Sequence, residues 1–164
     1  MKKKHFFFDQ NNDPVSGAIL DPKSREGQDF VNAIISEDPN IAFYMANATR
    51  GGDYDFKVRG INKKPKGQSE LQYKYRGSID ENGEFGSARD FGNFTAGMIA
   101  ARSGFTWDES RVAFDMLQTL QETTIIPILG KPVPNIVPTR EPLTTIKAQL
   151  HGFLYGIQRF QRKK

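Results

Sequence analysis

The sequence has no cysteine among its 164 residues. Disulfides, thiol catalysis and thiolate metal sites are therefore excluded. It also has no apolar run close to the roughly 18 residues that a membrane-spanning helix needs, so we expect no stable insertion into a membrane. Histidine is scarce: His5 lies near the N-terminus, and we interpret His151 as a residue on the flank of the last helix.

The excess of positive charge is small, 23 Lys and Arg against 19 Asp and Glu, which gives a net charge of +4. A basic surface favours contact with phosphate polymers. Many proteins without a nucleic-acid partner are equally basic, however, so the charge alone does not identify a target. The basic loop around Lys63 and Lys64 is the segment that we expect to contact a polyanionic substrate.

The hydrophobic pattern predicts a mainly α single domain of about five helices with a small two-stranded β element. We interpret residues 1–24 as an irregular N-terminal lead-in and residues 25–164 as the folded domain. The first helix is expected to begin near Ser24. The second is expected to open with Asp38 as its N-cap and Pro39 at its first position, and to stop at Arg50-Gly51-Gly52.

The hydrophobic pattern in the second half of the chain predicts three further helices. The first of them places Phe91, Phe94, Met98 and Ala101 on one face, and Gly104 follows it as a C-terminal cap. Thr106 and Glu109 match a capping box that opens the next helix. A final helix is expected from about Leu143. The apolar residues expected to form the buried face of the helix after Thr106 are Ala113, Met116, Leu117 and Leu120.

Between these blocks, the alternation of Leu71, Tyr73 and Tyr75 with polar residues predicts a half-buried strand. The segment from Ile79 to Gly83 is rich in turn-forming residues and is expected to close a hairpin. The stretch from Pro127 to Pro142 contains too many prolines for a regular helix.

The first candidate site is the segment that follows Gly51-Gly52. Asp53, Asp55 and Lys57 place two carboxylates and an ammonium group within five residues. Such a set provides acid–base groups and a cation that stabilises a developing negative charge. The alternative interpretation is an exposed loop of ordinary solvated charges.

The second candidate site is Asp90-Phe91-Gly92-Asn93-Phe94. On a helix, Asp90, Asn93 and Gly97 are expected to share a face. Gly92, Asn93 and Gly97 have low helix propensity, so each of them costs free energy in a helix. Residues with such a cost concentrate at functional or tightly packed positions. The alternative is helix–helix packing through small residues, with Asp90 acting as a helix cap.

Together these segments resemble the polymorphic toxin type 44 family. The resemblance rests on Gly51-Gly52-Asp53-Tyr54-Asp55-Phe56-Lys57, on Asp90-Phe91-Gly92-Asn93-Phe94 with Gly97 one turn later, and on Gly104-Phe105-Thr106. It spans roughly residues 40 to 120. Arg89 departs from it, because the family has an acidic residue at this position.

The resemblance implies an effector domain of a secreted antibacterial toxin that is delivered into a target bacterial cell and neutralised by a cognate immunity protein. It also implies a hydrolase, with ribonuclease as the expected activity. Carried over by position, the catalytic residues are Asp55, Lys57, Asp90 and Asn93. We expect Asp53, Tyr54, Arg89, Lys63 and Lys64 to bind the substrate.

Three chemistries stay open at this point. A metal-independent ribonuclease needs a base, an acid and cationic help for the phosphate, and no cofactor. Alternatively, Asp55, Asp90 and Asn93 hold a divalent metal through hard oxygen ligands. A peptidoglycan hydrolase acting in the periplasm uses two carboxylates that flank a glycosidic bond. A non-enzymatic module that binds a partner is the fourth alternative.

Overall fold

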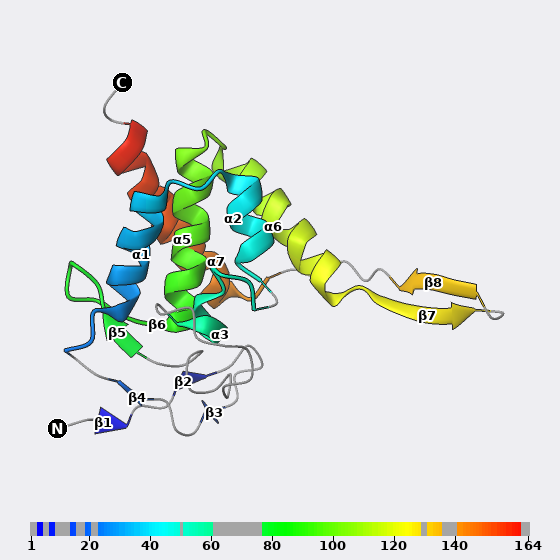
Figure 1. The fold of residues 1–164 in the computed structure, drawn as a ribbon, viewed down its shortest axis with the longest axis horizontal. Coiled ribbons are helices and arrows are strands. Elements are labelled where there is room, and N and C mark those ends of the chain that lie inside the picture. The colour runs from blue at the N-terminus through cyan, green and yellow to red at the C-terminus, as the bar shows by residue number, and fades with distance from the viewer. Residues whose placement is uncertain are drawn as a thin grey trace.

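The structure, a computed structural model, describes residues 23–49, 51–60, 77–128, 131–135 and 141–161, together with four two-residue strands nearer the N-terminus. The helices are α1 (Glu26–Glu37), α2 (Ile41–Asn47), α3 (Phe56–Arg59), α5 (Ala88–Arg102), α6 (Trp107–Glu122) and α7 (Leu143–Gly156), which continues as the π-helical turn η1 (Ile157–Gln161). The strands are β1 (Lys3–Lys4), β2 (Phe7–Phe8), β3 (Pro14–Val15), β4 (Ile19–Leu20), β5 (Gly77–Ile79), β6 (Phe85–Ser87), β7 (Thr124–Ile128) and β8 (Lys131–Asn135). The predicted mainly α fold with a small β component is confirmed (Figure 1).

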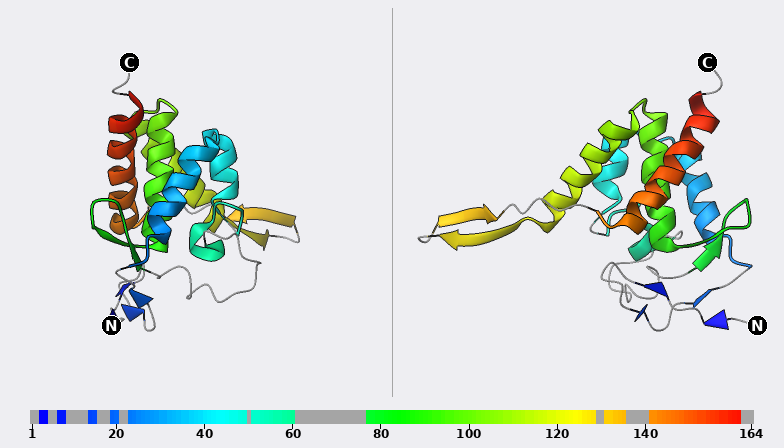
Figure 2. Two further views of the ribbon diagram at one scale, coloured as in Figure 1. Left: turned by 60° about the vertical axis from the view of Figure 1, so that its left-hand side comes forward. Right: turned by 180° about the vertical axis from the view of Figure 1, so that it is seen from behind.

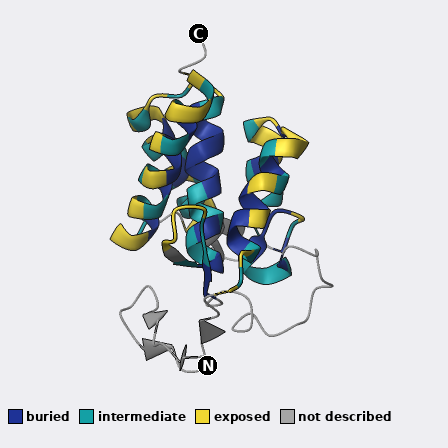
Figure 3. Ribbon diagram, turned by 90° about the vertical axis from the view of Figure 1, so that its left-hand side faces the viewer, coloured by how far each residue is buried: buried dark blue, intermediate teal, exposed yellow. Residues whose placement is uncertain are grey.

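Helix α5 is the centre of the domain, because α1, α2, α3, α6 and α7 all pack against it. Its residues from Thr95 to Ala101 are buried without interruption, so the helix is covered around its circumference and not along one stripe. Small residues make this possible, since they let neighbouring helices approach closely. In Figure 3 the buried residues lie where the helices face one another.

The closest of these contacts joins α5 to α7. A Cβ atom placed on Gly97 would lie 1.9 Å from the carbonyl oxygen of Gln149, which leaves no room for any side chain there. The sequence left open whether Gly97 serves a ligand or helix packing. The structure shows helix packing, with the backbone of α7 in the space that a larger residue would occupy.

The connection between α1 and α2 differs from the prediction. Asp38 does not cap α2: it ends α1 in the left-handed region, with φ of 49°, and its backbone N–H donates to the Ile34 carbonyl oxygen. The cap of α2 is Asn40, whose side-chain oxygen accepts from the Phe43 N–H at 2.9 Å. The helix ends at Asn47, earlier than predicted. Asp38 and Asn40 are both residues that commonly cap helices, and they flank Pro39. The prediction that Asp38 caps α2 was wrong, because Asn40 does so.

The predicted hairpin after Ile79 is confirmed. Strands β5 and β6 pair antiparallel, and between them the Asp80 carboxylate accepts from the Asn82 N–H at 2.9 Å and from the Glu84 N–H at 2.7 Å. The pair belongs to a sheet of order β1-β4-β5-β6, in which β4 and β5 are parallel. The strand predicted around Tyr73 lies outside the described residues.

Helix α6 begins where the sequence predicted, with both halves of the Thr106–Glu109 capping box formed. The buried apolar residue among the described side chains of α6 is Phe114. Its predicted buried face is wrong at two of four positions: Met116 and Leu120 are 61% and 62% exposed, whereas Ala113 and Leu117 are partly buried. The reason is that the C-terminal part of α6 leads away from the other helices. It continues into an antiparallel hairpin of β7 and β8, built by the proline-rich segment, which projects from the helical body (Figures 1 and 2). We call residues 124–135 the β7–β8 arm.

Candidate active site

A cleft of about 180 Å³ lies between α2, the segment from Gly51 to Gly60, the first turns of α5, the middle of α6 and the start of α7. The polar groups lining it come from the end of α2, from both candidate segments of the sequence, from α6 and from the start of α7. They are Thr49, Tyr54, Asp55, Lys57, Arg89, Asn93, Gln118, Glu141, Thr145 and Gln149. The fold therefore joins residues that are separated by up to 100 positions in the chain.

The loop that carries Asp55 is held in place by its own polar groups. Asp55 is 2% exposed, and its Oδ2 accepts from the Gly51 N–H at 2.8 Å. Arg59 donates to the Gly51 carbonyl oxygen at 3.2 Å and forms an ion pair with Asp53 at 3.3 Å. Asp53, predicted to bind substrate, does not line the cleft, and its side chain is 58% exposed.

Aromatic residues anchor the same loop to the core. Tyr54 stacks on Tyr44 with ring centroids 5.5 Å apart, and its hydroxyl donates to Glu37 at 2.8 Å. Burial, and then the Glu37 carboxylate, raise the pKa of Tyr54 to about 12. Phe56 stacks on Phe30 at 4.4 Å. The aromatic residues of the motif thus fix the positions of Asp55 and Lys57, which lie between and beside them.

Tyr44 of α2 lines the cleft and contacts α5. It is fully buried, its hydroxyl donates to the Gly92 carbonyl oxygen at 3.3 Å, and burial raises the pKa of the hydroxyl. The hydroxyl therefore stays protonated at neutral pH and acts as a hydrogen-bond donor. This bond ties α2 to the turn of α5 that carries Asn93.

Two cations line the cleft without a carboxylate partner among the described residues. Lys57 has no ion pair there, and Arg89 donates to the Thr145 hydroxyl at 2.7 Å. Other arginines of low exposure in the described residues differ, since Arg59, Arg102 and Arg111 each pair with an Asp or Glu. The positive charge of Lys57 and Arg89 is thus not paired with a carboxylate of the described residues.

Asp90 lies on another side of α5 and does not line this cleft. Its carboxylate accepts from the backbone N–H of Ser87 at 2.8 Å and from the Ser87 hydroxyl at 2.7 Å, which completes the capping box of α5. The Asp55–Lys57 segment therefore lines one cleft with Asn93 and not with Asp90. The geometry of Asp90 is that of a helix cap.

Asp90 instead lines a second cavity, of about 340 Å³, between α5, α7 and the β5–β6 hairpin. His151 lines it too, on the exposed side of α7 as the sequence predicted. The two carboxylates of the alternative metal site, Asp55 and Asp90, thus belong to different cavities. Within the described part of the chain, no three His, Asp or Glu side chains are grouped so as to hold a metal ion.

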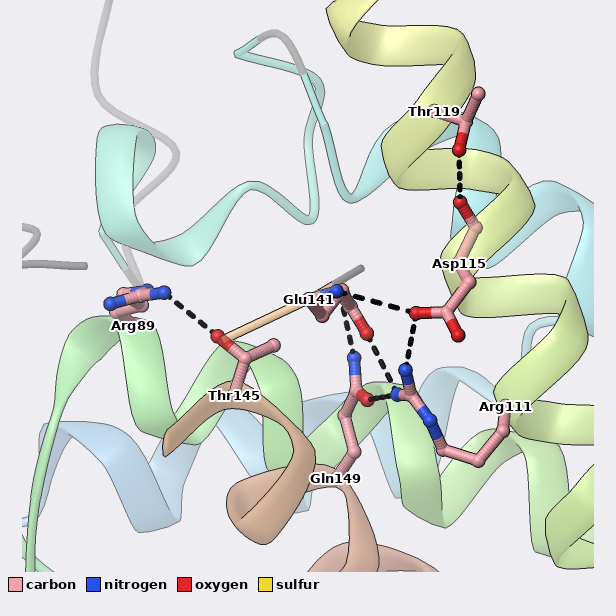
Figure 4. Close-up of polar contacts among 7 residues, drawn as sticks. All are labelled: Arg89, Arg111, Asp115, Thr119, Glu141, Thr145 and Gln149. Carbon is pink, nitrogen blue, oxygen red and sulfur yellow. Dashed lines mark hydrogen bonds and ion pairs between the residues drawn. The ribbon is translucent and has the colours of Figure 1, made fainter. Parts of the chain in front are cut away.

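A network of charged and amide side chains at the start of α7 was missed by the sequence analysis (Figure 4). Arg111 donates to Glu141 at 2.8 Å and to Gln149 at 2.6 Å, and it also pairs with Asp115. Gln149 in turn donates to Glu141 at 3.1 Å. The one signal in the sequence was the i, i+4 spacing of Arg111 and Asp115, which says nothing about Glu141. That residue brings a second carboxylate to the cleft.

Two of the predicted substrate-binding residues, Lys63 and Lys64, lie outside the described residues. None of the described helices has both the length and the apolar character that crossing a bilayer requires. Comparisons of the chain with known protein families, with curated proteins and with solved structures found no match.

Proposed function

We propose that this chain is an antibacterial toxin effector domain that cleaves RNA in the cleft between α3, α5 and α7. The observation that carries the proposal is that Lys57 and Arg89 line one cleft with Asp55, while neither cation has a carboxylate partner among the described residues. Guanidinium and ammonium groups without a carboxylate partner are suited to binding a phosphate. Arg binds a phosphate through two parallel hydrogen bonds.

The roles follow from the chemistry of RNA cleavage. Asp55 takes the proton of the 2′-hydroxyl, whose oxygen bonds to phosphorus while the bond from phosphorus to the 5′-oxygen breaks. The Lys57 ammonium gives its proton to the leaving 5′-oxygen, and the products are a 2′,3′-cyclic phosphate and a 5′-hydroxyl. Arg89 and the Asn93 amide donate to the phosphate oxygens, where negative charge develops. Asp90 acts from outside the cleft, by capping the helix that carries Arg89 and Asn93.

The biological setting rests on the resemblance to the polymorphic toxin type 44 family. That resemblance implies a secreted protein that enters a target bacterium, and an immunity protein in the producing cell. The basic character of the whole chain agrees with a polyanionic substrate.

A peptidoglycan hydrolase is the second candidate, because Asp55 and Glu141 both line the cleft. Two carboxylates on opposite sides of a glycosidic bond are the usual machinery of glycan hydrolysis. Glu141 is already engaged by Arg111 and Gln149, and this candidate leaves Lys57 and Arg89 without a role. We therefore rank it second.

The two candidates are separated by producing the domain in bacteria with and without a periplasmic signal. RNA cleavage predicts growth arrest from the cytosol, with degraded RNA and intact cells. Glycan hydrolysis predicts lysis or rounding from the periplasm alone, and that result would replace the proposal. Inert behaviour in both compartments at confirmed expression would favour a binding module.

Purified protein gives the matched comparison of variants. Asp55→Asn and Lys57→Met are expected to lower the rate of RNA cleavage at least 100-fold, which is the usual contribution of an acid or base. Lys147→Met is the control, because Lys147 is exposed on α7 and lines neither cavity. If Asp55→Asn and Lys57→Met keep the activity of the control, the assigned site is wrong.

A further inference from the structure

Glu141 presents a carboxylate to the cleft that the proposed cleavage chemistry does not use. It lies just before α7, lines the cleft together with Lys57 and Arg89, and has a side chain that is only 10% exposed. A carboxylate is costly to bury unless it is hydrogen-bonded and paired with a cation. The contacts of Glu141 therefore show which of its hydrogen-bonding positions are already filled.

Both oxygens of Glu141 are held by neighbours, and each keeps room for one more hydrogen bond. Oε2 accepts from Arg111 at 2.8 Å, and Oε1 accepts from Gln149 at 3.1 Å (Figure 4). A carboxylate oxygen can accept two hydrogen bonds, and each of these oxygens accepts from one side chain among the described residues. The carboxylate is thus fixed in place with two neighbouring acceptor positions for a ligand.

The charge of the network favours a ligand group that donates hydrogen bonds. Arg111 pairs with both Glu141 and Asp115, so one positive group faces two negative groups and the cluster has a formal net charge of −1. The Glu141 backbone N–H donates to Asp115 at 3.3 Å, which ties the residue to α6 as well as to α7. Glu141 is therefore a firmly held hydrogen-bond acceptor.

This acceptor lies about one helical turn away from the proposed phosphate contact. Arg89 donates to Thr145 at 2.7 Å, and Glu141 is held by Gln149. Thr145 and Gln149 are four residues apart on α7, which corresponds to about 6 Å along the helix axis. In Figure 4 the two contacts follow one another along the start of this helix. One nucleotide can therefore reach both, with its phosphate at Arg89 and its base at Glu141.

Neighbouring side chains of the cleft provide apolar contact for a base. Leu117 of α6 and Pro142, which follows Glu141 directly in the chain, line the same cleft and are partly buried. Proteins bind the bases of single-stranded RNA through their faces as well as through their hydrogen-bonding edges. A base in this cleft therefore has apolar side chains for its faces and a carboxylate for its edge.

We propose that Glu141 recognises guanine, as the base of the nucleotide whose 2′-hydroxyl attacks the phosphate. The inference rests on the proposed RNA cleavage and names the base that the same cleft selects. Guanine offers two adjacent donors on its Watson–Crick edge, N1–H and the N2 amino group, which match the two oxygens of a carboxylate.

The other three bases do not offer this pair of donors. Adenine and cytosine place a ring nitrogen, which is an acceptor, beside their amino group. Uracil places its one N–H between two carbonyl oxygens. Each of them therefore turns at least one acceptor toward the Glu141 carboxylate, which has no proton to donate when it is ionised.

Four oligonucleotides that are deoxy except for a single ribonucleotide test the base preference directly. Only the ribonucleotide supplies an attacking 2′-hydroxyl, and the four strands differ only in its base. The wild type is expected to cleave the guanine strand at least about tenfold faster than the others, measured as kcat/KM, because a bidentate contact to a base discriminates by about this factor or more. Equal cleavage of all four strands would overturn guanine recognition and leave the proposed function standing.

Glu141→Gln removes one of the two acceptors and keeps the shape of the side chain. Per folded molecule, it is expected to lower kcat/KM for the guanine strand and to leave the other three nearly unchanged, so that the preference disappears. Asp115→Asn is the matched control: it disturbs the same arginine but does not line the cleft, and the preference should remain. A purely structural role of Glu141 would lower all four rates together, and that result would also overturn the proposal.

A binding measurement on the wild type covers the case in which Glu141→Gln does not fold. A 2′-deoxy oligonucleotide with one guanine is compared, by fluorescence anisotropy, with the same strand carrying hypoxanthine, which lacks the N2 amino group. The hypoxanthine strand is expected to bind at least about fivefold more weakly, because one of the two hydrogen bonds to the carboxylate is lost. Equal affinity for the two strands contradicts the proposal. Tighter binding of the guanine strand without any cleavage of RNA would show that the cleavage chemistry is wrong while base recognition stands.

Discussion

Gly152 of α7 lies directly against Phe94 of α5: a Cβ atom on Gly152 would come within 1.8 Å of the Phe94 carbonyl oxygen. The obstacle is backbone, which cannot turn aside as the end of a flexible side chain does. Gly152→Ala must therefore push the two helices apart, and we expect a loss of about 3 kcal/mol in the free energy of unfolding, at the upper end of the range for overpacking. Urea denaturation followed by circular dichroism measures this.

Gly92→Ala on α5 is the matched control. A Cβ atom there would have no atom within 4 Å apart from the local backbone of its own helix, so the substitution removes the cost of glycine in a helix without a clash. We expect a gain of about 0.5–1 kcal/mol. Similar denaturation midpoints for the two alanine variants would contradict the close packing of α5 on α7.

The features that were predicted correctly from the sequence are those that neighbours in the chain determine. The Thr106–Glu109 capping box is local, since both of its partners lie in one turn, and so is the turn around Asp80. The central helix was also found, although its burial on all sides was not. That burial depends on how many helices surround α5, which its own periodicity does not record.

The features that were missed depend on distant parts of the chain. Met116 and Leu120 have the spacing of a buried face, but α6 leads away from the body at these residues. Glu141 reaches the cleft because Arg111, thirty positions earlier, holds it there. Asp90 and Asn93 were expected on one face, and the small rotation between them is enough to direct them into different cavities. Patterns along the sequence do not encode such pairings.

The role of Asp90 is tested by its partner in the capping box. If the role of Asp90 is to cap α5 together with Ser87, then either Ser87→Ala or Asp90→Ala removes the hydrogen bonds between the two residues. Both variants should then lose a similar free energy of unfolding, about 1 kcal/mol each. Both should then keep similar cleavage activity per folded molecule. Loss of activity in Asp90→Ala with full activity in Ser87→Ala would show that Asp90 takes part in the chemistry.

Anion binding by Lys57 and Arg89 predicts a change in the salt dependence of binding. A 2′-deoxy oligonucleotide serves as a ligand that cannot be cleaved through the 2′-hydroxyl. For a single strand, each lost phosphate contact should reduce the slope of log K against log salt by about 0.7. Lys57→Met and Arg89→Met are expected to show this reduction in fluorescence anisotropy titrations, and Lys147→Met to keep the slope of the wild type. An unchanged slope in both cleft variants would exclude phosphate contact by these cations.

The raised pKa of Tyr54 predicts a loss of stability at high pH. In the unfolded chain the hydroxyl titrates near 10, whereas burial and the Glu37 carboxylate raise the folded pKa to about 12. The folded state therefore holds this proton more tightly, and its stabilising contribution is complete below pH 10 and disappears as the pH rises through 12. Tyr54→Phe has no proton to lose and should show a flatter decline in denaturation midpoint over this interval. Identical pH profiles for the variant and the wild type would contradict the shift.

The contact of Arg111 with Glu141 is expected to couple the two residues energetically. Both side chains are largely buried, at 15% and 10% exposure, so Arg111→Met leaves the carboxylates of Glu141 and Asp115 without their cation. We expect a loss of about 3 kcal/mol in the free energy of unfolding. Adding Glu141→Gln to this variant should cost less than Glu141→Gln costs in the wild type, because the charge that it removes is already unpaired.

Arg159→Met, which removes an exposed contact with Tyr155, is the control and should change stability by less than about 0.5 kcal/mol. Losses that simply add in the double variant would show that Arg111 does not hold Glu141 at the cleft.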